Sequence, residues 1–235
     1  MSVEETDGRL ESVGGFTAGW FASDLGMYRP SRGTYQLYAY DSLPPLEPAP
    51  FTGDFGWLGD LGEPDPGQEE PIAALERGLA ELGLTLPRDF AAFQRSAEEV
   101  RLVLDEVSVT ACWTDVSLPL PSPVEEGARL VRFLRDQQDC LLWYLYLRPG
   151  GEAFVICSYL DYAYEYEARE AGEETGVDLA DRAQQLDSIL WCAPSFEEFA
   201  YRFWAENRIW HALHGAGPAA LGPTLRRYLA HYGDV

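Results

Sequence analysis

Apolar residues repeat with helical spacing before residue 95, with strand-like spacing in the middle of the chain, and with helical spacing again near its end. In the first of these segments they stand three or four apart, at Ile72, Leu75, Leu79 and Leu82. That spacing predicts a helix with one apolar face. Pro71 suits its first turn, and Gly83 supplies a stop. Pro87 then begins a second, shorter helix that carries Phe90 and Phe93.

The middle of the chain predicts β-strands. Its clearest part is "CLLWYLYLRPGGEAFVICSYL", two apolar runs joined by a turn at 148–152, which predicts an antiparallel hairpin. Because both arms are almost continuously apolar, we expect the hairpin to be central and covered on both faces. Residues 128–136 alternate, which predicts a strand with Arg132 and Arg135 on opposite faces. Further strands are expected at 35–40, 100–110 and 186–192.

The last long helix has a well-defined start. Ser195 with Glu198 three residues later forms a capping box. An apolar stripe at helical spacing follows, at Phe196, Phe199, Ala200, Phe203, Trp210 and Leu213. Gly215 and Gly217 end the helix, and a short basic helix is expected at 223–231. Helices before and after a run of strands predict an α+β fold, with an antiparallel sheet flanked by helices.

Three regions are expected along the chain. Residues 1–69 form an N-terminal extension, 70–213 the α+β domain, and 214–235 a loop and short helix. Residues 41–71 hold seven Pro and five Gly, which predicts irregular structure. A free linker seldom carries several large apolar side chains, and this one has Phe51, Phe55, Trp57 and Leu58. We therefore expect the segment to be irregular and packed on the core.

The charge is strongly acidic. Thirty-nine acidic residues stand against 17 basic ones, all of them Arg, giving a formal net charge of −22. This balance argues against binding to nucleic acid or to an anionic membrane, because both need a basic surface. It would attract a basic protein partner.

The segment "LDYAYEYEAREAGEE", residues 160–174, concentrates this charge beside tyrosines. The candidate partner-binding residues are Asp161, Tyr162, Tyr164, Glu165, Tyr166, Glu167, Glu170, Glu173 and Glu174. Alternation of tyrosines and acids suits a strand, whereas Tyr159, Tyr162 and Tyr166 also fit helical spacing, so both forms stay open. The segment is either a specificity element or the solvated rim of an acidic protein.

Catalytic signals are sparse. His211 and His214 stand three apart at a helix end and could ligate a metal, although histidines there also complement the helix dipole. No G-x-S-x-G and no Gly-rich phosphate loop occurs. Asn207 falls on the apolar stripe and is expected to be a hydrogen-bonded core amide. The sequence predicts no catalytic residue, no metal site and no cofactor.

Cysteines and apolar runs point to the cytoplasm. Cys112, Cys140, Cys157 and Cys192 have no C-x-x-C spacing and fall where buried strands are expected, which predicts reduced thiols. The opening "MSVEETDGRLE" is acidic and does not resemble a signal peptide. The longest apolar run, "CLLWYLYL", is too short to span a bilayer.

Three stretches, in order, resemble the SUKH superfamily of toxin-immunity proteins and cell-wall regulators. "IAALERGLAELGLTLPRDFAAF" is similar to the family's opening helix, Leu-Pro turn and aromatic short helix. "RFLRDQQDCLLWYLYLRPGGEAFVI" resembles its central hairpin, and "PSFEEFAYRFWAENRIWHAL" its closing helix. The resemblance implies a non-enzymatic α+β domain that binds a protein. It transfers no site residues.

Three hypotheses for the function follow. The first is an immunity protein that neutralises a cognate bacterial toxin, such as a basic nuclease, with the acids of 161–178 as the steering surface. The second is an intracellular regulatory or scaffold module that binds through an apolar patch around Trp20, Phe21, Phe51 and Trp57. The third is a metal-dependent enzyme that uses His211 and His214.

Overall fold

The apolar hairpin is the centre of the fold. The computed structural model describes residues 11–47 and 51–233, and the acidic opening residues 1–10 lie outside them. Strands β7 (Leu142–Leu147) and β8 (Ala153–Ser158) pair antiparallel along their whole length. Their turn places Gly150 and Gly151 at φ of +99° and +93°, where a side chain would be strained. Every residue of β7 is buried, which confirms the expected central hairpin.

The hairpin belongs to a mixed, mostly antiparallel sheet, so the α+β prediction is confirmed. In the described part of the chain the sheet has nine strands, in the order β1-β2-β9-β8-β7-β6-β4, with β3 paired to β2 and β5 to β6. The other strands are β1 (Ser12–Val13), β2 (Phe16–Ala22), β3 (Gln36–Ala39), β4 (Trp113–Thr114), β5 (Leu120–Pro121), β6 (Arg129–Arg135) and β9 (Ile189–Ala193). Only the β2–β9 pair among these is parallel.

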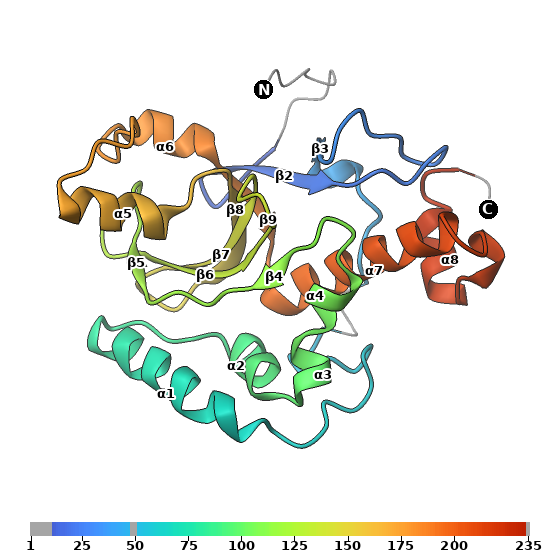
Figure 1. Cartoon of the computed structure of the whole chain (residues 1–235), viewed down its shortest axis with the longest axis horizontal. Helices are drawn as coiled ribbons and strands as arrows, with labels where there is room; N and C mark the ends of the chain where they lie inside the picture. Colours follow the sequence, from blue (N-terminus) through green and yellow to red (C-terminus); the bar gives the residue numbers. More distant parts are fainter. Residues whose placement is uncertain (1–10, 48–50, 234–235) are drawn as a thin grey trace.

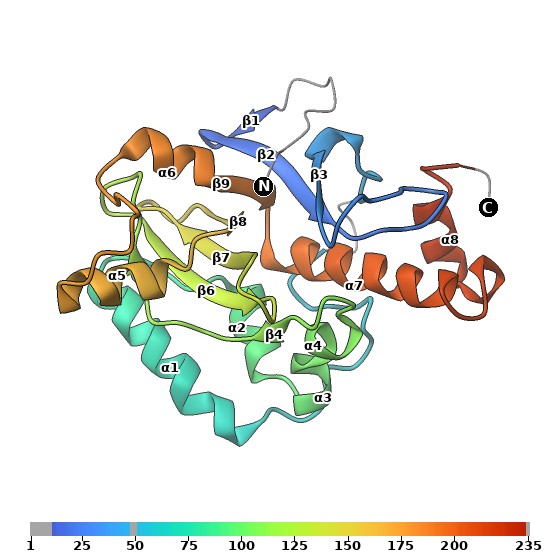
Figure 2. The same ribbon diagram turned by 45° about the horizontal axis from the view of Figure 1, so that its top comes forward.

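Helices cover both faces of this sheet (Figure 1). One face carries α1 (Pro66–Glu81), α2 (Arg88–Arg95), α4 (Val103–Val107) and α7 (Phe196–Leu213). The other face carries α5 (Tyr162–Ala171) and α6 (Arg182–Ser188). The remaining helices are α3 (Glu98–Arg101) and α8 (Pro223–Leu229), with short 3₁₀ turns at Tyr40–Ser42 and Pro218–Ala220. Figure 1 shows α5 and α6 above the sheet and α1 below it, and Figure 2 shows β1, β2 and β3 together at the top of the molecule.

Alternation along the strands builds two cores. On β7, Trp143, Leu145 and Leu147 enter the core with α7, while Leu142, Tyr144 and Tyr146 enter the core with α5 and α6. The first core is centred on Phe196. Its ring lies 5.0 Å from Phe90, 5.2 Å from Phe93 and 5.1 Å from Phe133, centroid to centroid.

The start of α7 has the Ser195 cap, which is one of the two hydrogen bonds of the predicted capping box. The Ser195 side chain accepts a hydrogen bond from the Glu198 amide at 3.2 Å. We expect Ser195→Ala to lower the free energy of unfolding by about 1 kcal/mol, because the Glu198 amide loses its acceptor. Urea denaturation measures this, and Ser195→Asp, which keeps an acceptor at the cap, is the control. Equal stability of the alanine variant and the wild type would contradict the assigned cap.

The irregular segment before α1 is packed down, as expected. Phe55 is fully buried and adopts φ of +52°. The Glu197 carboxylate, at the start of α7, accepts hydrogen bonds from the amides of Gly53 at 2.6 Å and Phe55 at 2.8 Å. These two bonds hold a segment without regular structure against the first turn of α7.

The expected strand at 100–110 is wrong. Helices α3 and α4 occupy most of it. Four apolar residues of this segment pack on the core: Val100, Val103, Leu104 and Val107. The last three stand three, four and seven positions after Val100, which is helical spacing. This helical spacing prevails over the β-branched composition, because one buried face outweighs a modest strand propensity.

Two element boundaries also differ from prediction. Helix α1 begins at Pro66, capped by the Asp65 side chain on the Gly67 amide, so Pro71 lies inside it rather than in its first turn. Leu82 follows its last residue and is exposed. The strand expected at 186–192 is β9 preceded by α6, whose last residues overlap it.

The described part of the first 69 residues is built into the sheet. Strand β2, which the sequence did not predict, lies between β1 and β9 and buries Trp20 and Ala22 in the core with α7. The predicted strand at 35–40 is β3, paired to β2. Residue 69 is therefore not a boundary of the sheet, because strands from before and after it pair with each other.

Candidate functional site

The acidic segment 160–174 is a helix rather than a strand. Asp161 caps α5, and its carboxylate accepts from the amides of Ala163 at 3.1 Å and Tyr164 at 3.5 Å. Gly172, at φ of +75°, ends the helix. The buried positions of α5 are Tyr162, Glu165 and Ala168. Because these buried positions stand three residues apart, the segment has helical and not strand periodicity, and this settles the choice between helix and strand that the sequence left open.

Tyr162 and Glu165 face the protein interior, which corrects their assignment as partner contacts. The Tyr162 ring is fully buried, and its hydroxyl lies 3.1 Å from Gln185 Oε1 and 2.9 Å from Ser188 Oγ. Burial raises the pKa of Tyr162 to about 12. Glu165 is buried and accepts a hydrogen bond from the Thr175 hydroxyl. Both side chains attach α5 to the rest of the protein.

The other predicted residues form an exposed acidic surface. Tyr164 is exposed and Tyr166 is half-buried against the sheet. We define the acidic layer by the exposed carboxylates of α5, α6 and the loop between them: Glu167, Glu170, Glu173, Glu174, Asp178, Asp181 and Asp187. Residues 161–188 contain two bases, Arg169 and Arg182, against nine acids. The layer can therefore attract a cationic surface.

Asp161 also belongs to an ion-pair cluster beside this layer. The cluster consists of Asp115, Arg132, Arg135, Asp139 and Asp161. Arg132 contacts Asp161 at 2.5 Å and Asp115 at 2.7 Å. Arg135 contacts Asp139 at 2.5 Å and Asp115 at 3.0 Å. Three carboxylates against two guanidinium groups leave the cluster with one net negative charge.

A bulge in β6 brings the two arginines of this cluster together. The pairing register of β6 with β7 shifts between Arg132 and Leu134, so Arg132 and Arg135 reach the same aspartate. Strict alternation predicted opposite faces, and the shifted register is the reason that this prediction is wrong. The bulge has no sequence signal here, so the cluster could not be found from the spacing of residues.

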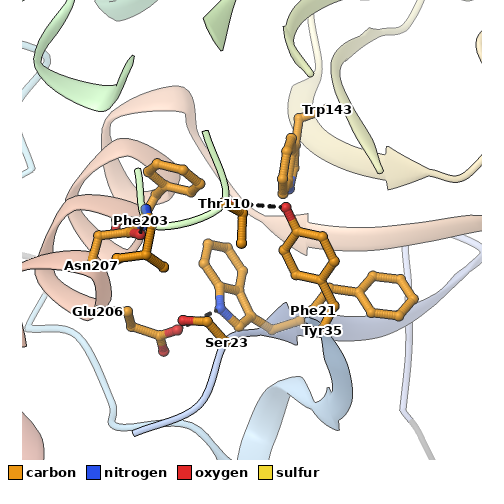
Figure 3. A pocket seen from close by; sticks show the side chains of 10 residues that line it. Phe21, Ser23, Tyr35, Thr110, Trp143, Phe203, Glu206 and Asn207 are labelled. Atoms are coloured by element: carbon orange, nitrogen blue, oxygen red, sulfur yellow. Dashed lines mark hydrogen bonds between the residues drawn. The ribbon is translucent and has the colours of Figure 1, made fainter. Parts of the chain in front are cut away.

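A small cavity lies on the opposite side of the sheet, between β2 and α7 (Figure 3). Its volume of about 20 Å³ suits a single water molecule rather than an organic substrate. Tyr35 and Thr110 close one wall through a hydrogen bond of 2.8 Å. Glu206 lines it, and this carboxylate accepts hydrogen bonds from Arg29, Trp20 and Tyr228. The arrangement is a buried network around one carboxylate, in which both terminal nitrogens of Arg29 are hydrogen-bonded and its Nε is not.

The histidine pair has other partners. His211 Nε2 lies 3.0 Å from the Val107 carbonyl oxygen, and His214 stacks on Trp210 with centroids 3.9 Å apart. Within residues 11–47 and 51–233 there is no group of three or more His, Cys, Asp or Glu side chains placed to hold a metal. Asn207 is a buried amide bonded to Val109 and Phe203, as expected.

The four cysteines are unpaired, and one departs from prediction. Cys112, Cys157 and Cys192 are buried, whereas Cys140 is exposed in the turn before β7. Burial raises the pKa of Cys112 and Cys192, which makes both thiols poor nucleophiles. The apolar patch expected around Trp20, Phe21, Phe51 and Trp57 is also not a surface: Trp20 is buried and the others are partly buried against the cores.

No protein-family model, curated protein or solved structure matches the chain. Among the helices of the described ranges, none combines the length and apolar character needed to cross a bilayer. The acidic layer and the adjoining ion-pair cluster are the main charged features of this surface.

Proposed function

We propose that this chain is a non-enzymatic, immunity-type protein that binds and neutralises a basic toxin domain. The observation that carries the proposal is the acidic layer, in which exposed carboxylates of α5, α6 and their loop outnumber arginines. A toxin that acts on nucleic acid presents Arg and Lys for phosphate contacts. A surface of carboxylates attracts those same side chains and can cover them.

The resemblance to the SUKH superfamily supports the same function. Its three stretches correspond to α1 with α2, to the β6–β7–β8 strands, and to α7. An antiparallel hairpin between helices is the arrangement that the resemblance implies. The unpaired cysteines suit action in the reducing cytoplasm.

The acidic layer is rigidly attached, which suits recognition. Tyr162 anchors α5 to Gln185 and Ser188 of α6, and Asp161 anchors it to Arg132 of β6. A partner therefore meets a helix whose position is set before binding. Less conformational entropy is lost on binding to such a surface than to a flexible acidic segment.

The association rate tests this proposal. The probe is the purified product of the neighbouring gene, with its catalytic residue inactivated where it is a toxin; a neighbouring gene that encodes no basic protein would count against the proposal. We expect the association rate constant to fall at least roughly tenfold between about 50 and 500 mM NaCl, because salt screens exposed charges. Replacing Glu167, Glu170, Glu173 and Glu174 together by glutamine should lower the rate at low salt and flatten its salt dependence.

A matched control keeps the change in net charge constant. Glu63, Glu81, Glu98 and Glu99 are exposed and lie outside the acidic layer. Their replacement by glutamine removes the same four charges and should slow association much less. Equal effects of the two quadruple variants would assign the attraction to net charge alone. Affinity that is insensitive to salt would favour the regulatory or scaffold function instead.

A further inference from the structure

Most exposed apolar side chains stand close in sequence to the aspartates of the ion-pair cluster. Of the described residues, seven large hydrophobic side chains are exposed: Met27, Leu82, Trp113, Val116, Leu118, Tyr159 and Tyr164. Five of these seven lie within three residues of a cluster aspartate in sequence: Trp113, Val116 and Leu118 near Asp115, and Tyr159 and Tyr164 near Asp161. Leu118 is 75% exposed and Tyr164 55%. Single exposed apolar side chains are normal, whereas several on one surface point to a contact site.

The cluster holds the two segments together. Arg132 bonds to Asp115 and Asp161 at once, so the segment 113–118 and the start of α5 share one guanidinium group. The Arg135 guanidinium also lies over the Trp113 ring, 5.3 Å from its centroid. Asp115 and Asp161, 46 residues apart in sequence, thereby join their two segments into one surface, which we call the edge surface.

The edge surface includes the open side of the sheet. Strand β4 ends the strand order, and in the described chain β5 pairs only with β6. The amides of Asp115 and Ser117 donate to Phe133 and Arg132 of β6. By the alternation of an extended chain, the amides of Val116 and Leu118 point away from β6. The Thr114 amide is bonded to Asp105, and Pro119 has no amide hydrogen, so the open stretch is short.

We propose that the edge surface is the docking site of the basic toxin domain, with Leu118 and Tyr164 as apolar contacts and Trp113 at the other end of the segment 113–118. The inference rests on the proposed function, because it names the surface through which this protein would bind the toxin domain. The acidic layer begins on the same helix, with Glu167 and Glu170 one and two turns beyond Tyr164. Charge would then guide approach, and the apolar residues would supply the buried contact.

Charge selects a basic partner over a second copy of this chain. The cluster is net negative, and each copy carries a formal charge of −22, so two copies repel each other. An Arg-bearing surface is attracted to the cluster and can also stack on exposed Tyr and Trp rings. The central arginines are already neutralised, so docking does not require the partner to supply carboxylates.

The test uses the same inactivated toxin domain and two pairs of variants. Leu118→Ser with Tyr164→Ala should weaken binding at least tenfold, mainly through faster dissociation. Met27→Ser with Leu82→Ser changes the two exposed hydrophobic residues that lie off the edge surface, and should leave the affinity within about twofold of wild type. Thermal unfolding of each free variant checks that it is folded.

Hydrogen exchange of the wild-type complex provides a measurement that needs no variant. We expect the toxin domain to slow exchange in peptides that cover 113–118 and 159–166, and to leave the loop around Met27 unchanged. If the wild type binds but these peptides are not protected, the edge surface is not the docking site. The same holds if the two variant pairs bind the toxin domain with equal affinity. Either result leaves the proposed function standing. If the wild type does not bind at all, the proposed function fails and the edge surface fails with it.

Discussion

Glu206→Ala is expected to lower the free energy of unfolding by about 3 to 5 kcal/mol, because it leaves the buried Arg29 without its counter-charge. Both side chains are almost fully buried, and their closest contact is 2.7 Å. Glu206 also accepts from Trp20 Nε1 at 3.0 Å and from the Tyr228 hydroxyl at 2.8 Å. One carboxylate therefore joins β2, the loop after it, α7 and α8.

Chemical denaturation measures this loss, and Arg208→Ala is the control. Arg208 lies on the exposed face of the same helix, so its replacement should change stability by no more than about 0.5 kcal/mol. A loss below about 1 kcal/mol for Glu206→Ala would show that water or a neighbouring group replaces the carboxylate. Glu206→Gln, which keeps the shape, separates the loss of charge from the loss of volume.

The same carboxylate makes a pH-dependent contribution. Burial by itself would raise the pKa of Glu206, but the charge and hydrogen bonds of Arg29 and the charge of Arg202 hold it below its ordinary value. A carboxyl whose pKa is lower in the folded state stabilises the fold above its unfolded pKa and loses that contribution as pH falls. The stability difference between wild type and Glu206→Gln should therefore be full near pH 7 and shrink below about pH 4.

Tyr162→Ala is the second large effect, with an expected loss of about 3 to 5 kcal/mol. The substitution removes a fully buried ring that packs on Tyr144, with centroids 5.7 Å apart. It also leaves Gln185 and Ser188 without a shared partner. Tyr164→Ala, two residues along the same helix, removes an exposed ring and should cost about 0.5 kcal/mol or less.

The affinity for the toxin domain and the free energy of unfolding should distinguish these two variants in different ways. Tyr162→Ala removes hydrogen bonds between α5 and α6 and should disturb the acidic layer indirectly, while Tyr164→Ala should remove only the proposed contact from a folded protein. Urea denaturation and affinity for the toxin domain, measured on both, distinguish the two roles. A large stability loss in Tyr164→Ala would contradict the placement of its ring at the surface.

Segments with one dominant pattern were predicted well. The β7–β8 hairpin, the Ser195 cap of α7 and the short helix after Pro87 follow from local periodicity and end signals, and the structure has them where expected. Residues 100–110 failed because two patterns overlapped, β-branched composition and helical spacing. Strand β2 was missed because Gly19 and aromatic residues on both faces hide its alternation.

The candidate site depended more on tertiary structure. The sequence located an acidic, tyrosine-bearing segment and its charge, but not which tyrosines are exposed. That choice follows from which side of α5 meets the sheet, and it buries Tyr162 while leaving Tyr164 outside. Asp115 entered the site only because β4 and the following segment pair with β6.

The sequence by itself determined the net charge, the alternation that builds two apolar cores around one hairpin, and the helix that closes the chain. These depend on composition and on contacts between residues close in sequence. Only the tertiary structure decided that Arg132 and Arg135 meet, that Glu206 joins four segments, and that Arg132 links the segment 113–118 to the start of α5. Each of these depends on strand register or helix docking, which is set by packing over the whole chain and leaves no local mark in the sequence.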